Sequence, residues 1–270
     1  MNVARVATLA GEKVVATGFI GGYTGSLIEE DAREQGIITE FVRRKEESRI
    51  CINILDTGTG TQTEILEEGE PVMEGEEAKM LEKYRQLLSG AEVVSISGSV
   101  PKGVSSGLYA KMIELANNAH LPVLLDTSGS SLKNSLRARP TLIKPNKEEL
   151  EQLLECEITK EEEYHSCGAR LQEEGIPYVV ISLGEKGSLL VAPSGTYRAR
   201  VPELEAVNTV GCGDSMIAGF AIGFRQRWKD EEMLRYASAI SAANALRVET
   251  GYFKKADFDE LYPRIIIEKL

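Results

Sequence analysis

The sequence predicts an α/β protein with a doubly wound, mostly parallel sheet that carries helices on both faces. Short runs rich in Val, Ile and Leu, typical of strands buried on both faces, alternate with amphipathic runs of helical length. This alternation is typical of parallel strands joined by helical crossovers. With 270 residues, 42% of them hydrophobic, the chain is long enough to build one such domain with a substantial core.

An amphipathic helix is predicted first, over residues 2–10, because Val3, Val6 and Ala10 share a face and Gly11 suits a C-cap. The predicted strands are Val14–Ile20, Val93–Ile96, Val123–Asp126, Thr141–Lys144, Tyr178–Leu183 and Ser188–Val191. The predicted helices between them are Ser26–Glu34, Gly75–Leu88, Ser106–Ala119, Lys147–Leu154 and Lys160–Glu174. The last third is predicted to be helical over Ser215–Trp228, Glu231–Glu249 and Asp257–Lys269.

Residues 49–69 break this alternation and are predicted to form part of a small β lid. Ile50, Ile52 and Ile54 recur at every second position, and a second β-rich segment, Gln62–Glu68, follows the Gly-rich turn 57–60. This pattern is typical of an antiparallel hairpin. From the pattern alone, a lid over a site and an edge of the main sheet are equally supported.

The composition argues against several classes of partner. The formal net charge is −11, whereas binding to nucleic acid or an anionic membrane needs clustered Lys and Arg. The four cysteines have no C-x-x-C spacing and there are only two histidines, which argues against a zinc site. No apolar run is long enough to span a bilayer. We therefore expect a cytoplasmic protein that acts on small molecules.

The strongest candidate for chemistry is the segment 210–220, in which Gly211 and Gly213 closely precede an amphipathic helix. Glycines let the backbone approach a ligand, and a helix N-terminus offers free N–H groups to an anion. Asp214 lies in the first turn, where its carboxylate can accept a proton from a hydroxyl that attacks a phosphoryl group. An Asp that caps the helix explains the local pattern equally well.

A second candidate follows the predicted strand that ends at Lys144. Asn146 and Glu149 have the spacing of a capping box, so a well-capped helix is one interpretation. The other is that both side chains face the crevice at the carboxyl end of the sheet, where such folds bind ligands. Glu149 could there hold Mg²⁺ through water, since Mg²⁺ keeps several waters and needs few protein carboxylates.

Three more polar or Gly-rich segments follow predicted strands, at Ser182–Gly187, Ser97–Gly103 and Asp126–Gly129. Each alone is explained by a tight turn. Together they are stronger evidence for a site, because the carboxyl ends of parallel strands gather along one edge. The sequence has no G-x-x-x-x-G-K-[ST], H-R-D or D-F-G segment, which argues against a P-loop enzyme or a typical protein kinase.

Together these segments resemble the phosphofructokinase-B family of ribokinase-fold sugar kinases, in family order along the chain. The segment Asn208–Gly219 resembles the C-terminal signature of the family, and Ile143–Leu150 and Ile181–Gly187 resemble its nucleotide-side elements. The likeness is greatest to 1-phosphofructokinases and tagatose-6-phosphate kinases. It rests on residues 47–50, 62–67, 126–129, 244–246 and 250–251.

The resemblance implies an ATP- and Mg²⁺-dependent kinase domain over residues 1–270 that phosphorylates fructose 1-phosphate or tagatose 6-phosphate to a bisphosphate. Asp214 is implied as the base, with the backbone of Gly211, Cys212 and Gly213 as an anion hole. The residues implied around ATP are Lys144, Asn146, Ser182, Gly184, Gly187 and Asn244. The sugar side is implied to include Asn2, Arg49, Ser97 and Asp214, with Glu149 acting through Mg²⁺. A homodimer through the lid is also implied.

Two departures from the family pattern matter. Cys212 stands where the family usually has Ala, and we expect the nearby helix end to lower the pKa of its thiol. The family also opens with a strand carrying a sugar-binding Asp, a strand pair of the lid and a G-G-K-G segment, and Met1 stands just after these. We therefore expect a truncated start, with nucleotide binding but poor sugar phosphorylation.

Two alternatives stay open, the first of them suggested by the missing start. The chain could be a catalytically impaired nucleotide- or sugar-binding protein of the same fold. It could also be a kinase that acts on fructose 6-phosphate or a nucleoside instead.

Overall fold

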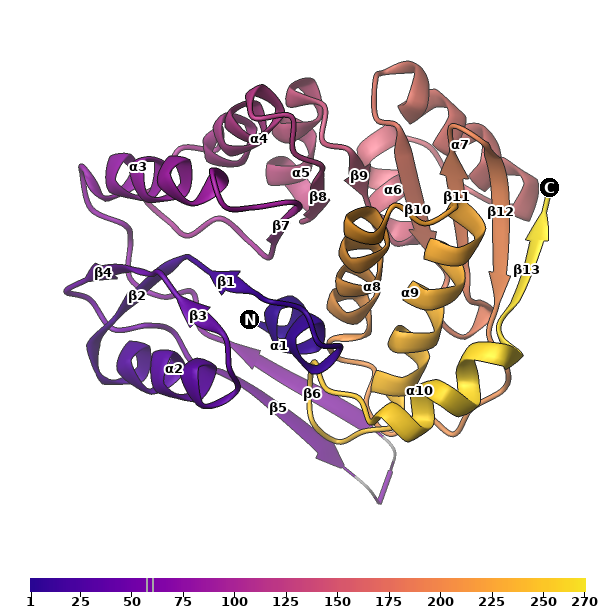
Figure 1. Cartoon of the computed structure of the whole chain (residues 1–270), viewed down its shortest axis with the longest axis horizontal. Helices are drawn as coiled ribbons and strands as arrows, with labels where there is room; N and C mark the ends of the chain where they lie inside the picture. Colours follow the sequence, from indigo (N-terminus) through magenta and orange to yellow (C-terminus); the bar gives the residue numbers. More distant parts are fainter. Residues whose placement is uncertain (57, 60) are drawn as a thin grey trace.

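The computed structural model, which describes residues 1–56, 58–59 and 61–270, is built around a seven-stranded sheet (Figure 1). Its parallel strands are β7 (Val94–Ser97), β8 (Val123–Asp126), β9 (Leu142–Ile143) and β10 (Tyr178–Ser182). An antiparallel meander continues the sheet as β11 (Ser188–Ala192), β12 (Gly195–Arg200) and β13 (Ile266–Lys269). The strand order is β13-β12-β11-β10-β9-β8-β7.

Helices cover both faces of this sheet, which confirms the predicted doubly wound fold. One face packs against α3 (Glu76–Leu88), α4 (Leu108–Asn118), α5 (Gly129–Ser135), α6 (Lys147–Leu154) and α7 (Glu161–Glu173). The other packs against α8 (Cys212–Gln226) and α9 (Asp230–Ala245). Val123 and Leu125 join the first core and Leu124 the second, because successive strand residues point to opposite faces.

The predicted N-terminal helix is present as α1 (Asn2–Leu9), which packs with α10 (Lys255–Leu261) against α8 and α9. Val6 is fully buried there, among Ala218, Ile222 and Phe253. The free space beside α8 is small, since a side chain at Gly219 would place its Cβ 2.5 Å from the Cα of Ala237. These contacts fix the position of α8.

The segment after α1 forms two short parallel ladders rather than one strand. β1 (Val15–Ala16) pairs with β3 (Ile38–Thr39), and β2 (Phe19–Gly21) pairs with β4 (Val42–Arg44), with α2 (Gly22–Glu34) as the crossover. The prediction of a continuous strand over Val14–Ile20 was wrong. The chain changes its pairing partner at Thr17 and Gly18. The hydroxyl of Thr17 donates to the carbonyl of Glu40, and the carbonyl of Gly18 accepts from the amide of Val42.

The predicted antiparallel hairpin is present as β5 (Cys51–Asp56) and β6 (Thr61–Leu66). It forms a two-stranded sheet of its own and is not an edge of the main sheet. In the predicted turn, Thr57 and Gly60 lie outside the described residues. The amides of Gly58 and Thr59 both donate to Oδ1 of Asp56, which closes the turn.

The C-terminus differs most from the prediction. The helix predicted over Asp257–Lys269 ends at Leu261, a short 3₁₀ turn follows at 262–264, and 266–269 becomes β13. Pro263 lacks the N–H that a continuing helix needs, and antiparallel pairing with β12 satisfies the backbone beyond it. Both β12 and α5 also escaped prediction. Among the residues described, no helix is both long and apolar enough to cross a bilayer.

Candidate active site

Helix α8 begins at the sheet's carboxyl edge through a glycine in the left-handed region. Gly211 is the N-cap, with φ of +81°, and the helix runs from Cys212. A Cβ at Gly211 would lie 2.7 Å from the amide nitrogen of Gly251, so only glycine fits. No side chain caps this helix. Asp214 is therefore not a capping residue, although the sequence allowed that interpretation.

The carboxylate of Asp214 instead faces α1. Nδ2 of Asn2 donates to Oδ2 of Asp214 over 2.9 Å, between residues 212 positions apart. Gly251, with φ of +64°, makes this approach possible, because a Cβ there would lie 2.6 Å from Cβ of Asn2. Asn2 and Asp214, two of the four residues that the resemblance placed on the sugar side, are thus in direct contact.

A buried ion pair lies beside the start of α8. Nζ of Lys144 is 3.2 Å from Oδ1 of Asp126, and their side chains are 8% and 18% exposed. A Cβ at Gly213 would lie 3.0 Å from that Nζ, so the glycine leaves room for the ammonium group. Burial raises the pKa of Asp126, Lys144 opposes this, and the negative charges of Asp214 and Glu149 raise it further. Asp126 is therefore influenced by two other carboxylates as well as by Lys144.

The sequence pattern indicates Asp126 only as part of a polar strand end. Its register opposite Ser97 on β7 and its pairing with Lys144 depend on strand order, which the sequence does not state. Its position at the carboxyl end of a buried strand was the one signal that could have singled it out.

The predicted capping box at the start of α6 is present. Oδ1 of Asn146 accepts from the amide of Glu149 over 2.8 Å, and Oε2 of Glu149 accepts from the amide of Asn146 over 2.9 Å. A bridge between Asn146 and Ser182 extends the pairing of β9 with β10 to this point. Glu149 caps the helix and also lies near the candidate site, since its negative charge raises the pKa of buried Asp126.

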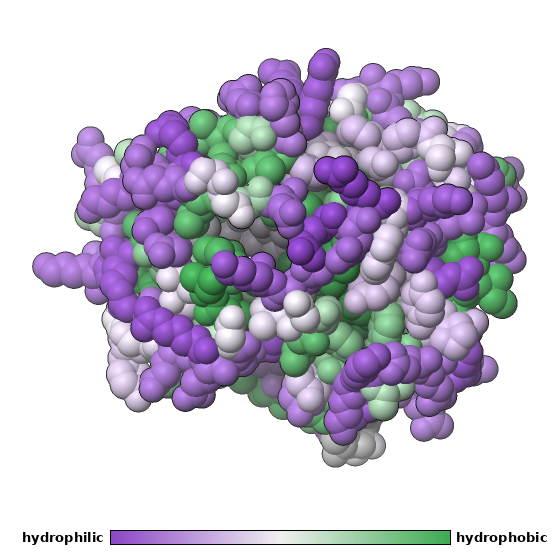
Figure 2. Space-filling view, in the orientation of Figure 1, coloured by the Kyte–Doolittle hydropathy of each residue, from purple (hydrophilic) through white to green (hydrophobic). Residues whose placement is uncertain are grey.

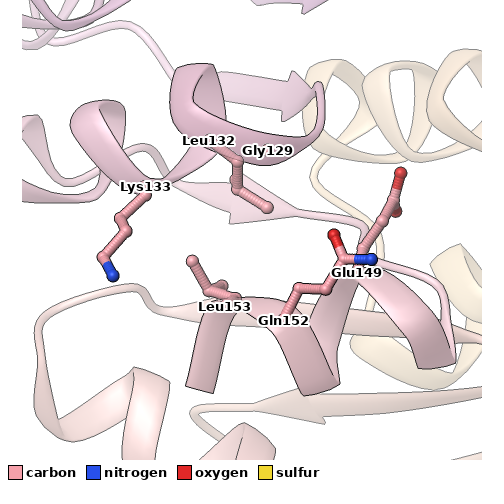
Figure 3. A pocket seen from close by; sticks show the side chains of 6 residues that line it. All are labelled: Gly129, Leu132, Lys133, Glu149, Gln152 and Leu153. Carbon is pink, nitrogen blue, oxygen red and sulfur yellow. The ribbon is translucent and has the colours of Figure 1, made fainter. Parts of the chain in front are cut away.

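A small pocket of about 90 Å³ opens between α5 and α6 next to Glu149 (Figure 3). Its lining comprises Gly129, Leu132, Lys133, Glu149, Gln152 and Leu153. It has room for a few water molecules and not for a nucleotide. In the described part of the chain no three His, Cys, Asp or Glu side chains form a metal-binding group. A Mg²⁺ ion held mainly by water and phosphate fits this arrangement, because it needs few protein ligands.

A much larger cavity, of about 1290 Å³, lies along the sheet edge from the start of α8 to α7. It exceeds the roughly 300–1,000 Å³ typical of small-molecule sites and so can admit a nucleotide. Among the predicted nucleotide-binding residues, those that line it are Asn146, Ser182, Gly184 and Gly187. Cys212 and Gly213 line it at α8. Gly184 has φ of +61° and no neighbour within 4 Å of a Cβ position, so its backbone is open to the cavity.

Asn244 and Lys144 do not line this cavity. Asn244 is fully buried, and its Oδ1 accepts from the hydroxyl of Ser215 and the amide of Tyr252. Its Nδ2 donates to the carbonyl of Val210 and to Sγ of Cys212. All four of these bonds stay within the chain, so the amide of Asn244 holds the loop before α8 in place.

The remaining predicted residues lie away from this cavity. Arg49 is exposed at the base of the hairpin, where its Nη2 donates to Oγ of Ser99 over 3.5 Å. Ser97 is exposed at the end of β7. The surface is hollowed between β7 and α1, with both polar and apolar side chains around the opening (Figure 2). Ser97 ends β7 and Asn2 begins α1, so both belong to elements that border this hollow.

The expectation that Cys212 has a lowered thiol pKa was wrong. Burial raises the pKa of Cys212, and the hydrogen bonds from Asn244 and Ser241 oppose this shift without overcoming it. The thiol lies beneath α9, where the loss of water outweighs the helix end.

Fold and site together define a class: an α/β protein that presents a carboxylate and a helix N-terminus beside a nucleotide-sized cavity. The model of the pfkB family carbohydrate kinases matches residues 1–256, and the chain belongs to this family. It is a sugar kinase by family, as the sequence motifs predicted.

Solved structures of similar proteins agree with this assignment. Phosphofructokinase-2 from Escherichia coli is 26% identical, with a TM-score of 0.91, covering 97% of this chain and 85% of that chain. A possible 1-phosphofructokinase from Thermotoga maritima is 27% identical, with a TM-score of 0.91, covering 100% and 86%. A putative phosphofructokinase from Staphylococcus aureus is 26% identical, with a TM-score of 0.87 and coverage of 100% and 86%.

The raised pKa of Cys212 predicts slow alkylation. Near neutral pH we expect iodoacetamide to modify Cys212 at least about tenfold more slowly than the exposed Cys51 and Cys156, because the thiolate is the nucleophile. The rate at Cys212 should increase as pH rises, since the thiol then loses its proton. Peptide mass spectrometry over time measures both effects, with the urea-unfolded chain as control. Equal alkylation rates at Cys212 and Cys51 in the folded protein would contradict a raised thiol pKa at Cys212.

Proposed function

We propose that the chain transfers the γ-phosphoryl group of ATP to a hydroxyl of a ketohexose phosphate, fructose 1-phosphate or tagatose 6-phosphate, to give the bisphosphate. The observation that carries this proposal is the contact of Asp214 with Asn2 at the N-terminus of α8, next to the large cavity. One carboxylate there lies between a place for a nucleotide and a surface hollow where a sugar can bind.

In this mechanism Asp214 accepts the proton of the attacking sugar hydroxyl. The new bond joins the sugar oxygen to the γ-phosphorus, and the bond from that phosphorus to the leaving oxygen of ADP breaks. Asn2 orients the carboxylate through its 2.9 Å hydrogen bond. This contact also keeps Oδ2 of Asp214 at a fixed distance from α1, the helix that borders the proposed sugar site.

The charge on the transferring group is stabilised by fixed groups of the chain. The backbone N–H groups of Gly211 and Gly213 form the anion hole, supported by the positive end of the helix dipole, whereas the amide of Cys212, which the resemblance also implied, donates to the carbonyl of Thr209. Lys144 lies beside Gly213 and is held by Asp126. A Mg²⁺ ion, when bound through water near Glu149, would neutralise phosphate charge.

The alternatives differ in their support. A catalytically impaired binding protein is not favoured, since both the family match and the phosphofructokinase neighbours concern sugar kinases. Fructose 6-phosphate remains a second candidate substrate because one solved complex of E. coli phosphofructokinase-2 contains it, at 25% identity. A nucleoside has no comparable support among these neighbours.

Replacing Asp214 by Asn should separate turnover from nucleotide binding. We expect kcat to fall about 10²–10⁴-fold, because the amide cannot accept the hydroxyl proton, with unchanged ATP affinity. A coupled ADP-release assay measures turnover, and titration calorimetry measures affinity. Asp259→Asn, an exposed aspartate on α10, is the matched control. Near-normal turnover of Asp214→Asn would refute its role as the base.

Arg49 is proposed to bind the phosphate that the sugar already carries. Arg49→Gln should lower kcat/KM for fructose 1-phosphate or tagatose 6-phosphate about tenfold, mainly through KM, since a charge-assisted contact is lost. The assay compares both sugars with fructose 6-phosphate, and Arg85→Gln on α3 is the control. If fructose 6-phosphate has the highest kcat/KM, the substrate assignment fails. If KM does not change, the role of Arg49 fails.

A homodimer through the hairpin is proposed from its apolar face. Ile50, Ile52, Ile54 and Ile65 are each about half exposed, at 48%, 51%, 49% and 51%. Ile52 pairs directly with Ile65 in the register, so both lie on one face. An exposed apolar stripe of this kind is typical of an interface.

Ile52→Glu should convert the dimer to monomer, because it buries a charge in the apolar contact. Sedimentation velocity at micromolar concentration measures the change. Glu64→Lys lies on the opposite face and is the control, since Glu64 pairs with Asn53. A wild-type chain that sediments as a monomer would contradict the proposal.

A further inference from the structure

Arg198 is a buried cation at the edge of the large cavity. It lies on β12 opposite Leu189 of β11, on the sheet face that α7 covers. Only 3% of its side chain is exposed. A guanidinium group is almost never buried to this degree without specific partners, so those partners indicate what the residue does.

The two partners of Arg198 belong to different walls of the cavity. Nη2 donates to the carbonyl oxygen of Lys186 over 2.8 Å, within the turn that joins β10 to β11. Nη1 lies 3.1 Å from Oε1 of Glu161, the first residue of α7. Lys186 and Glu161 both line the cavity. One rigid side chain therefore connects two segments that are 25 positions apart in sequence.

The turn held by Arg198 is also closed by its own backbone. It is a single 3₁₀ turn with three backbone bonds, from Lys186 to Leu183, from Gly187 to Gly184 and from Leu183 to Gly187. At its tip, a Cβ at Gly184 would have no neighbouring atom within 4 Å. At its end, Gly187 is packed so tightly that a Cβ would lie 2.1 Å from the carbonyl oxygen of Ala199. The carbonyl of Lys186 accepts none of these three backbone bonds, and Arg198 holds it from below.

The contacts of Arg198 do not satisfy the whole guanidinium. Nε and Nη1 are buried without a hydrogen-bond partner in the part of the chain described. Glu161 is 59% exposed, so water screens its charge and it compensates the cation only in part. A methionine would fill the same space without this cost, because a buried charge seldom improves stability over an apolar residue of similar size. The guanidinium therefore contributes little to the core beyond its connection of the two walls.

We propose that Arg198 is a positioning residue for the nucleotide: it holds the 184–187 turn and the start of α7 at the separation that bound nucleotide requires. This inference rests on the proposed function, in which the large cavity binds ATP. Arg198 itself lines the cavity, but its Nε and Nη1 are buried, so its proposed role is to hold the turn rather than to bind the nucleotide. It acts on affinity through the backbone of the turn that lines the cavity.

Arg198→Met tests the proposal, with Arg200→Met as the matched control. Arg200 lies two residues further along β12 and pairs with Glu268 on β13, outside the cavity lining. We expect Arg198→Met to weaken MgATP binding about tenfold in calorimetry and to raise the KM for ATP equally. The KM for the sugar phosphate and kcat at saturating ATP should stay within about twofold, as should all constants of Arg200→Met.

Two further variants keep the test decisive if Arg198→Met folds poorly. Arg198→Lys should recover part of the affinity, because one ammonium can reach the carbonyl of Lys186 but cannot bridge both walls. Glu161→Gln removes the charge of the exposed partner and should weaken ATP binding by a smaller factor than Arg198→Met. Thermal unfolding of each variant identifies those that are folded.

The outcomes separate the two proposals. Unchanged ATP affinity in a folded Arg198→Met or Arg198→Lys chain would overturn the role of Arg198 alone. An equal rise in the KM of the sugar phosphate would also overturn it, because general loosening moves both constants. If the wild-type chain binds no MgATP, the proposed function fails, and the role of Arg198 fails with it.

Discussion

Helix α8 packs so closely against α9 and the sheet edge that several of its positions have no room for a side chain. The position of Asp214 depends on this close packing. Four glycines make it possible: a Cβ at Gly211, Gly213, Gly219 or Gly223 would lie 2.5–3.0 Å from an atom of another segment. Ordinary side chains there would push the helix away from α9 and from the sheet edge. The lining of the cavity, the approach of Lys144 and the contact with Asn2 all follow from this placement.

The electrostatics of the site follow from the same crowding. Asp126 and Lys144 lose most of their water where α8 covers the sheet edge, so each depends on the other for compensation. The pKa of Asp126 is raised by burial first, and Lys144 limits the increase. Removal of either partner would leave the other buried with uncompensated charge beside Asp214. The pair thus keeps a positive charge near the helix N-terminus, where the transferring phosphoryl group is proposed to lie.

Local sequence patterns predicted the features that depend on neighbouring residues. They predicted the buried strands, the capping box at Asn146 and the start of α8, because glycine, proline and apolar periodicity determine local structure within a few residues. They missed β13 because its residues become a strand only by pairing with β12. They also missed the internal role of Asn244, the raised thiol pKa of Cys212 and the pairing of Asp126 with Lys144. Each of these depends on residues far apart in the chain.

The two halves of the site are built differently, and this difference has a consequence for specificity. On the nucleotide side, the cavity includes the backbone of turns whose shape is set by side chains beneath them, such as Arg198 below Lys186. On the proposed sugar side, the side chains themselves lie at the surface, on α1, at the end of β7 and at the base of the hairpin. Asp214 lies where the two halves meet. Substitutions on the sugar side can therefore change the acceptor without disturbing the turns, whereas nucleotide binding can be altered both at lining residues such as Asn146 and Ser182 and through the packing below the turns.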